Sequence, residues 1–350
     1  MPVLVYHSDF KLHDPSPYPH PETPERLDRM LSGLNTYNLL DSFKRVDVPV
    51  ADINIYSLVH SEDYLREVMR RGREGLEWLD PDTYICPGTH RALERLAGAA
   101  MLISEVISGG SDDLVLLLPR PPGHHAGISG PAMGAPTLGF CILNTSALIA
   151  RLLSKRGRVS VLDFDLHHGN GTQEIVYGDP RVQHIDIHQD PHTIYPGTGY
   201  TWQIGEGAAA GTKANIILPP GSGDDVFSEA VSAAVRILER FDPDYIVVSA
   251  GFDGYRGDNY MGAVRATASS YYRAGSLLTG LSRPVVVVVE GGYSIGLERG
   301  LPAFIAGLLK RGNPVSEDQT KSSGRVKERF REELAELLER LGMSLGAGHA

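Results

Sequence analysis

The feature that most limits the fold of this chain is a series of short apolar runs, rich in β-branched residues. They occupy residues 3–7, 113–119, 158–165, 182–188, 214–219, 245–251 and 284–292. Several are apolar throughout instead of alternating, which is typical of strands covered on both faces in a parallel sheet. Helix-like segments separate many of them, at residues 90–108, 141–156, 224–241, 262–281 and 297–311. This alternation predicts an α/β domain with a mostly parallel central sheet and helices on both faces.

The C-terminal part of the chain differs in composition from the rest. Residues 1–312 make up the predicted domain, residues 313–323 are polar and predict a linker, and residues 324–350 predict a helix with a short tail. One face of that helix carries Val326, Phe330, Leu334, Leu337, Leu338 and Leu341. Such an apolar face predicts packing onto the domain, with a subunit contact as the alternative.

Composition excludes several broad classes of protein. The net charge is −10 and no basic patch stands out, which argues against direct nucleic-acid binding but not against a basic substrate. Two cysteines imply no disulfide framework and favour a reducing compartment. No signal peptide or membrane-spanning run is evident, so we expect a cytoplasmic protein without a membrane partner.

Polar residues follow the apolar runs at the points where the strands should end. Residues 120–126 read RPPGHHA, 163–170 DFDLHHGN, 250–253 AGFD and 290–293 EGGY. Sites in open parallel sheets form at the carboxyl ends of the strands. We therefore expect these four segments to converge on one edge of the sheet.

The segment after residue 162 has the ligands for a metal ion. Asp163, Asp165 and His167 are two residues apart, which places them on one face of an extended chain. With Asp253 from another strand end, Asp165 and His167 would form a three-ligand site with room for water or substrate, as in catalytic metal centres. A buried hydrogen-bond network is the alternative interpretation.

The paired histidines and the tyrosine offer groups for acid–base chemistry. His124 and His125 follow a Pro-Pro-Gly turn, and Asp163 could orient one of them while Asn170 orients the other. Tyr293 follows two glycines and is a candidate donor to a developing oxyanion. Taken alone, the paired histidines could be a coincidence in a loop, and Tyr293 could serve only in ordinary packing.

Together these motifs resemble the histone deacetylase family, which includes acetylpolyamine amidohydrolases and acetoin-utilisation proteins. RPPGHHA, LGFCILN, DFDLHHGNGTQ, YPGTG, SAGFD and EGGY occur in the family's order, and the resemblance covers about residues 1–312. It implies the arginase–deacetylase fold, a deacetylase catalytic domain, and hydrolysis of N-acyl amides with one zinc ion. Iron(II) would suit the same ligands.

The resemblance also implies roles for individual residues. It makes Asp165, His167 and Asp253 the metal ligands and His125 the general base. His124 becomes its electrostatic neighbour, paired with Asp163, and Tyr293 polarises the substrate carbonyl.

The resemblance extends to the substrate tunnel and to a second ion. Phe140 and Tyr195 would form aromatic walls, and the Gly139 carbonyl would accept a substrate N–H. A potassium ion, which the family often binds, would lie at Asp163, Asp165, His167, Asp186 and Ile187.

Three departures from the family pattern concern catalysis and substrate choice. Asn170 stands where some members of the family have Asp, and members of the class II branch also have Asn at this position. The charge-free loop 126–139 is longer than expected, and we predict that it packs on its own domain, contacts a second subunit, or narrows the tunnel through Met133. Tyr260 lies where polyamine-selective members carry a Glu gatekeeper.

The sequence leaves the substrate open. Acetyl-lysine in a protein or peptide is favoured, with acetylpolyamines or other small acetylated amines as the alternative. A binuclear manganese enzyme would need a carboxylate where Gly169 stands, and a non-catalytic acyl-lysine reader would not need Tyr293 and a full ligand set. A homo-oligomer could form through the C-terminal helix or the loop 126–139.

Overall fold

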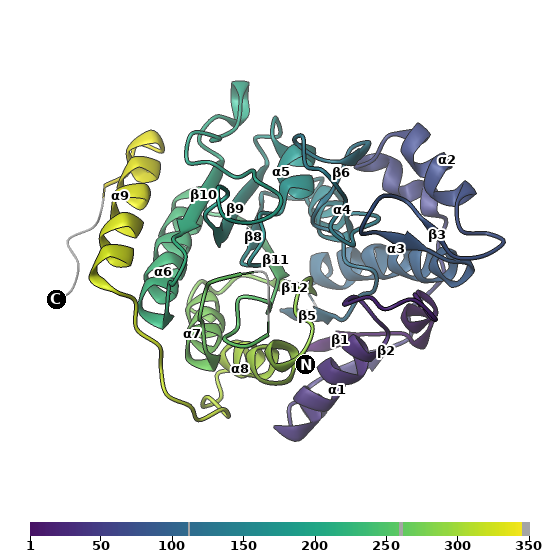
Figure 1. Ribbon diagram of the computed structural model, residues 1–350, viewed down its shortest axis with the longest axis horizontal. Helices are drawn as coiled ribbons and strands as arrows, with labels where there is room; N and C mark the ends of the chain where they lie inside the picture. The colour runs from purple at the N-terminus through teal and green to yellow at the C-terminus, as the bar shows by residue number, and fades with distance from the viewer. Residues whose placement is uncertain (111–112, 259–261, 345–350) are drawn as a thin grey trace.

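The computed structural model of the chain describes residues 1–110, 113–258 and 262–344. Its centre is a sheet of eight parallel strands in the order β10-β9-β8-β11-β12-β5-β1-β2 (Figure 1). In chain order the strands are β1 Val3–Val5, β2 Lys44–Val46, β5 Leu114–Leu117, β8 Val159–Asp163, β9 Val182–Gln189, β10 Lys213–Leu218, β11 Tyr245–Ala250 and β12 Val285–Val289. The predicted α/β class with a parallel sheet is confirmed.

The middle of the sheet is inaccessible to solvent. All five residues of β8 and of β12 are buried, which explains their unbroken apolar character. Burying one such valine contributes about 1.5–3 kcal/mol relative to leaving it exposed. These strands are therefore a rigid base for the side chains that follow them.

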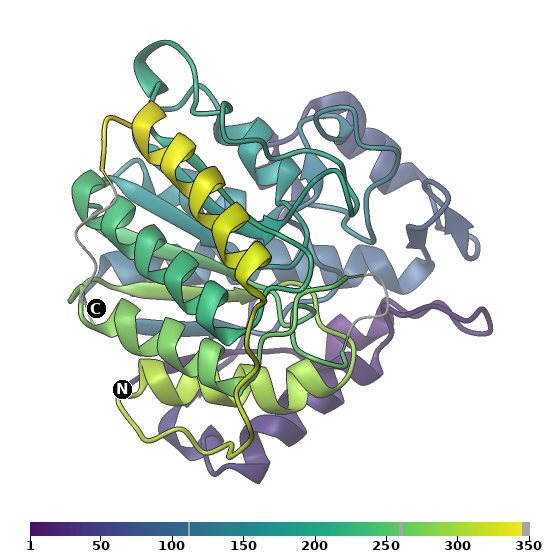
Figure 2. The same ribbon diagram turned by 60° about the vertical axis from the view of Figure 1, so that its left-hand side comes forward.

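Helices cover both faces of the sheet (Figure 2). One layer contains α1 Glu25–Thr36, α6 Asp224–Phe241, α7 Ala268–Thr279 and α8 Leu301–Leu308, with α7 packed between α6 and α8. The other contains α3 Pro87–Ser108, α4 Thr145–Leu153 and α5 Asn170–Val176. No helix among the described residues has the length and apolar character needed to cross a bilayer.

Smaller elements fill the connections. They are α2 Glu62–Arg70, the hairpin strands β3 Glu77–Trp78 and β4 Tyr84–Ile85, and the hairpin strands β6 Ala126–Gly127 and β7 Gly130–Pro131. The 3₁₀-helices are η1 Ser8–Leu12, η2 Leu40–Ser42, η3 Ile53–Leu58 and η4 Gly207–Ala209, and η5 Gly296–Gly300 is a π-helix. The helix expected at 224–241 has those bounds. The helix expected at 262–281 begins later, at Ala268, because Thr267 is its N-cap and accepts a hydrogen bond from the Ser269 N–H.

The last helix, α9 (Gly324–Arg340), packs along the edge strand β10 (Figure 2). Ser323 caps its first turn, and Phe330, Leu334, Leu337 and Leu338 are buried. The apolar face predicted from the sequence is thus covered by the chain's own domain, and α9 protects the exposed edge of the sheet.

Candidate active site

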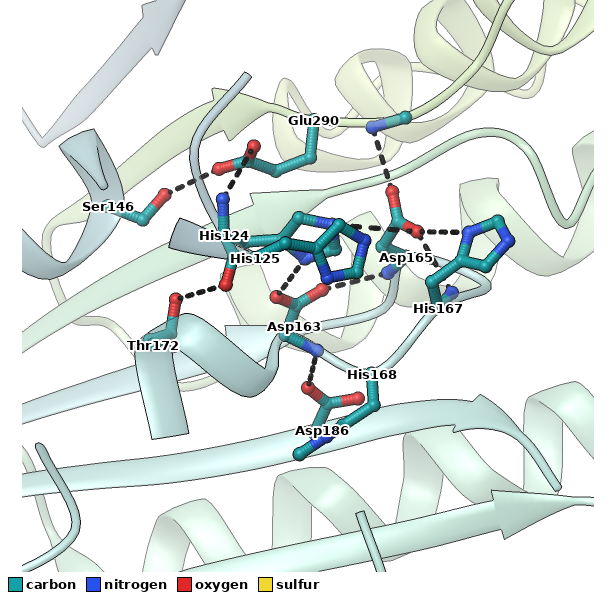
Figure 3. A network of polar contacts seen from close by, with 12 residues as sticks. His124, His125, Ser146, Asp163, Asp165, His167, His168, Thr172, Asp186 and Glu290 are labelled. Atoms are coloured by element: carbon teal, nitrogen blue, oxygen red, sulfur yellow. Dashed lines mark hydrogen bonds and ion pairs between the residues drawn. The ribbon is translucent and has the colours of Figure 1, made fainter. Parts of the chain in front are cut away.

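The four polar segments meet above the carboxyl ends of β5, β8, β11 and β12, which are neighbours in the sheet. Figure 3 shows side chains from three of these segments, among them His124, Asp165 and Glu290. The chain moves outward from β8 to β9 and β10, and then returns to place β11 on the other side of β8. Strand order therefore reverses beside β8, which is where open α/β sheets form their sites.

The three predicted metal ligands lie together and are buried. Nδ1 of His167 is 2.9 Å from Oδ2 of Asp253 and 3.2 Å from Oδ1 of Asp165. The ligand atoms of all three residues lie within 4.8 Å of one another, and Nε2 of His167 has no hydrogen-bond partner. Two carboxylates and one imidazole that converge in this way fit a divalent ion, so this group could hold a metal.

Two glycines let the backbone approach these ligands closely. A Cβ at Gly251 would lie 2.0 Å from Oδ2 of Asp165, and one at Gly291 would lie 2.4 Å from the same atom. The Gly291 N–H donates to this oxygen over 2.8 Å. The SAGFD and EGGY motifs therefore contain glycine for steric reasons as well as to supply an N–H.

His124 pairs with Asp163, over 3.0 Å from Nδ1 to Oδ2. Burial alone would lower the pKa of His124, but the carboxylates of Asp163 and Asp165 outweigh it and hold this pKa well above the usual range. Oε2 of Glu290 accepts from the His124 N–H over 3.3 Å, which fixes the backbone of the residue. His124 is thus a cationic neighbour of the predicted metal ligands, held through both its ring and its backbone.

The pKa of His125 shifts in the opposite direction to that of His124. Burial lowers its pKa well below the usual range, and the nearby charges of His124 and His167 lower it further. Its Nδ1 lies 2.8 Å from Oδ1 of Asn170, an oxygen that can only accept, so Nδ1 carries the hydrogen and Nε2 is the basic nitrogen. A neutral imidazole in this tautomer is ready to act as a base.

The predicted tunnel residues surround a cavity of about 470 Å³. It is lined by Pro21, Asp82, His125, Gly139, Phe140, His167, Tyr195, Asp258, Tyr293 and Ser294. The Tyr195 ring lies edge-on to His125, with centroids 4.9 Å apart, and its hydroxyl donates to the Thr137 carbonyl over 2.9 Å. The cavity therefore leads to His125 and His167 between aromatic walls.

The part of the cavity wall formed by Gly139 and Phe140 depends on backbone conformations that favour glycine. Gly139 has a φ of 54° and Phe140 a φ of 71°. A Cβ on residue 139 would lie 2.7 Å from Cδ2 of His125 and 2.8 Å from Cε1 of Tyr195. Residue 139 must therefore be glycine if His125 and Tyr195 are to keep their positions.

Tyr293 faces Phe140 across the cavity, with ring centroids 6.0 Å apart. The Asp258 carboxylate accepts its backbone N–H over 2.9 Å, and the Arg26 guanidinium lies 5.0 Å from its ring centroid. The ring is therefore positioned from both sides. Tyr260, the other predicted substrate residue, lies outside the described residues.

A second group that could hold a metal lies deeper, at Asp163, His184 and Asp186. It includes two of the residues predicted for potassium, and Asp186 accepts from the Gly169 N–H over 2.8 Å. Neither ring nitrogen of His184 makes a hydrogen bond, although its Nε2 lies 3.6 Å from Oδ2 of Asp186. The potassium site remains a prediction.

Sequence reasoning missed a buried ionic network behind the site. Glu22 accepts two hydrogen bonds from Arg120 and one from Arg26. Arg26 also donates to the carbonyls of Gly292, over 2.7 Å, and Glu290. Glu22 and Arg26 are four apart in the segment HPETPER, but such a spacing is equally typical of an exposed salt bridge, so the sequence held no clear signal.

The loop 126–139 packs on its own domain, one of the three expectations for it. Of the described residues that line the cavity, Gly139 is the one from this loop. The Met133 sulfur instead accepts from the Gln173 side chain of α5 over 3.7 Å. The idea that Met133 narrows the cavity is therefore wrong.

Comparison with known proteins agrees with this geometry. A family model for the histone deacetylase domain matches residues 20–308. The chain belongs to the histone deacetylase family. It is 34% identical to a probable deacetylase of Archaeoglobus fulgidus over 87% of this chain and 84% of the relative. It is 40% identical to the acetylpolyamine amidohydrolase of Burkholderia pseudomallei over 64% of this chain and 65% of the relative.

A solved structure shows the same architecture. The crystal structure of the HDA15 HD domain superposes with a TM-score of 0.84 at 28% identity, over 97% of this chain and 94% of that one. The chain therefore has the arginase–deacetylase fold, and its family places it among the hydrolases.

Proposed function

We propose that this protein is a metal-dependent deacetylase that hydrolyses N-acetyl amides, with acetyl-lysine in proteins or peptides favoured. The observation that carries the proposal is the cavity that ends at His125 and His167 between Phe140 and Tyr195. A cavity with these aromatic walls suits an acetylated alkyl chain that enters end-on. The acetyl group of such a substrate then lies close both to the three predicted metal ligands and to His125.

Asp165, His167 and Asp253 would hold one catalytic ion, and we propose zinc, with iron(II) as the alternative. Three protein ligands leave a position open, as in catalytic zinc sites. Bound there, the ion would polarise the amide carbonyl and lower the pKa of the attacking water to about 7.

The chain's own residues would then move the protons. Nε2 of His125 takes a proton from the attacking water and gives it to the leaving amine, since an amide nitrogen must be protonated to leave. The Tyr293 hydroxyl donates to the oxyanion that forms on the carbonyl oxygen. The charged His124 stabilises negative charge nearby and, by repulsion, disfavours a proton on His125.

Acetylpolyamines and other small acetylated amines are the second candidate substrates. Asp82 lines the cavity and would favour a cationic substrate, and one relative is named an acetylpolyamine amidohydrolase. Against this, the HDA15 HD domain matches over nearly the whole chain. We favour the peptide substrate for this reason.

Turnover by the metal-loaded protein tests the proposal. We would compare kcat/KM for acetyl-lysine peptides, acetylputrescine and acetylspermidine, with metal content measured in the same samples. We expect hydrolysis of acetylated amines, fastest for the peptides. No turnover of any of them by protein with a full equivalent of zinc or iron(II) would overturn the assignment.

A further inference from the structure

The short helix α5 presents two side chains to the loop 126–139. Asn170 and Glu174 are four residues apart and so lie on one face of the helix. The Asn170 amide donates from Nδ2 to the Ala132 carbonyl over 2.9 Å. The Glu174 carboxylate accepts from the Ile128 N–H over 2.9 Å and from the Met133 N–H over 2.8 Å.

The Ala132 carbonyl decides which way the Asn170 amide points. A carbonyl oxygen can only accept, so it selects the orientation in which the NH₂ group faces the loop. Oδ1 must then face His125 and accept from its Nδ1–H over 2.8 Å. If the amide turned over, its NH₂ group would face Nδ1 and favour the tautomer with hydrogen on Nε2, which cannot act as a base.

Glu174 helps to position the Ala132 carbonyl, which also accepts from the Ala135 N–H within the loop over 2.9 Å. Its two oxygens hold the Ile128 N–H near the start of the loop and the Met133 N–H directly after residue 132, so the loop is tied to α5 at two points. A Cβ on Gly127 would lie 2.5 Å from Oε1 of Glu174, so the loop also lies directly against this side chain. Charge-assisted bonds to a carboxylate are stronger than neutral ones.

Other contacts hold the two ends of the loop independently. The Ile128 carbonyl accepts from the Ser61 N–H over 2.7 Å, and the Leu138 N–H donates to Asp80 over 2.6 Å. Loss of the Glu174 carboxylate should therefore release the segment around Ala132 without detaching the whole loop.

We propose that Glu174 is a positioning residue that sets the tautomer of His125 through the Ala132 carbonyl and the Asn170 amide. The inference rests on the proposed function in that it concerns the base of that reaction. It adds a role for the loop 126–139, which supports the base from behind while its last residue lines the cavity.

Kinetics of Glu174→Gln test this relay. A glutamine keeps the shape but has one acceptor oxygen and would place an NH₂ group against a backbone N–H. Since acid–base catalysis is worth about 10²–10⁴ in rate, partial loss of the correct tautomer should lower kcat about tenfold, with KM and metal content unchanged. Glu77→Gln is the matched control, because Glu77 also accepts a backbone N–H, from Gly72, but contacts none of the site residues.

A double variant separates a relay from general destabilisation. If Glu174 acts through Asn170, then Glu174→Gln should have no further effect on kcat in an Asn170→Ala background. Multiplicative losses in the double variant, or an unchanged kcat in Glu174→Gln, would overturn the inference.

A spectroscopic reading does not depend on turnover. Nitrogen-15 NMR of histidine-labelled, metal-loaded protein distinguishes the two ring tautomers, and a His125→Gln sample identifies the signal. We expect hydrogen on Nδ1 in the unchanged protein and a mixture in Glu174→Gln. The same tautomer in both would refute the relay, whereas a change of tautomer in a protein that hydrolyses no acetylated amine would refute the proposed function alone.

Discussion

The floor and the wall of the cavity are built in different ways. On the floor, Asp165, His167 and Asp253 follow the ends of two adjacent buried strands, and the Gly291 N–H next to a third strand fixes one carboxylate. On the wall, Gly139 and Phe140 have positive φ, and their neighbours come from distant loops. The floor inherits its geometry from the sheet, whereas the wall depends on individual contacts between loops.

This difference explains what could be predicted from the sequence. Asp163, Asp165 and His167 could be placed because parallel strands bring their carboxyl ends to one edge of the sheet. The pairing of His124 with Asp163 and of His125 with Asn170 also followed from proximity to those ends, although the residues alone did not say which histidine took which partner.

The wall could not be predicted in the same way. The Phe140 N–H donates to the Thr83 hydroxyl over 3.0 Å, and the Thr137 hydroxyl donates to Asp82 over 2.6 Å. No periodicity links residues so far apart in the chain. Glu174 was missed for a similar reason, since a glutamate on a short helix usually faces solvent.

Among substitutions that leave the metal ligands intact, the largest effect is expected where floor and wall meet, at Tyr293. Its backbone follows β12, while its ring faces Phe140. Tyr293→Phe should lower kcat on an acetyl-lysine peptide by about 10²–10³, because the oxyanion loses one donor. Metal content and thermal unfolding, measured on the same sample, should not change. An unaltered kcat would remove this residue from the reaction.

The wall should also be sensitive to acid. His60 links the loop that ends at Gly139 to the start of α4. Its Nδ1 donates to the Gly127 carbonyl over 2.7 Å, and its Nε2 accepts from the Asn144 N–H over 2.9 Å. Burial lowers the pKa of His60 to about 4. The unfolded chain therefore binds this proton first as the pH falls, and the stability that depends on neutral His60 is complete above about pH 6.5 and lost toward pH 4.

Denaturant unfolding across this range provides the check. The loss from His60 should be at most about 3 kcal/mol between pH 6.5 and 4. A glutamine can make the same two hydrogen bonds without titrating, so His60→Gln should unfold with a shallower pH dependence. Equal slopes for the two proteins would show that His60 does not make the wall sensitive to acid.

A smaller effect is expected at Gly139, where the wall touches the base. Gly139→Ala should lower kcat about tenfold by displacing His125, because a misplaced base loses part of the 10²–10⁴ that acid–base catalysis provides. Gly211→Ala is the matched control, since Gly211 also has positive φ, 83°, but lies outside the loop 126–139, and a Cβ there meets no atom within 4 Å. Both variants should lose about 1 kcal/mol of stability, whereas kcat should fall only for Gly139→Ala. Equal kcat values would mean that the wall does not position His125.

The central claim is that the floor holds one metal ion on which the hydrolysis depends, and metal titration of chelated protein tests it most directly. We expect one tight equivalent of zinc or iron(II) per chain, with deacetylation restored in proportion to the metal bound. Asp253→Ala should bind no tight equivalent and show no turnover, while Asp244→Ala, which removes a carboxylate that accepts the Arg158 N–H at the other end of the sheet, should behave as the unchanged protein. Full turnover by metal-free protein, or a full equivalent and full activity in Asp253→Ala, would contradict the claim.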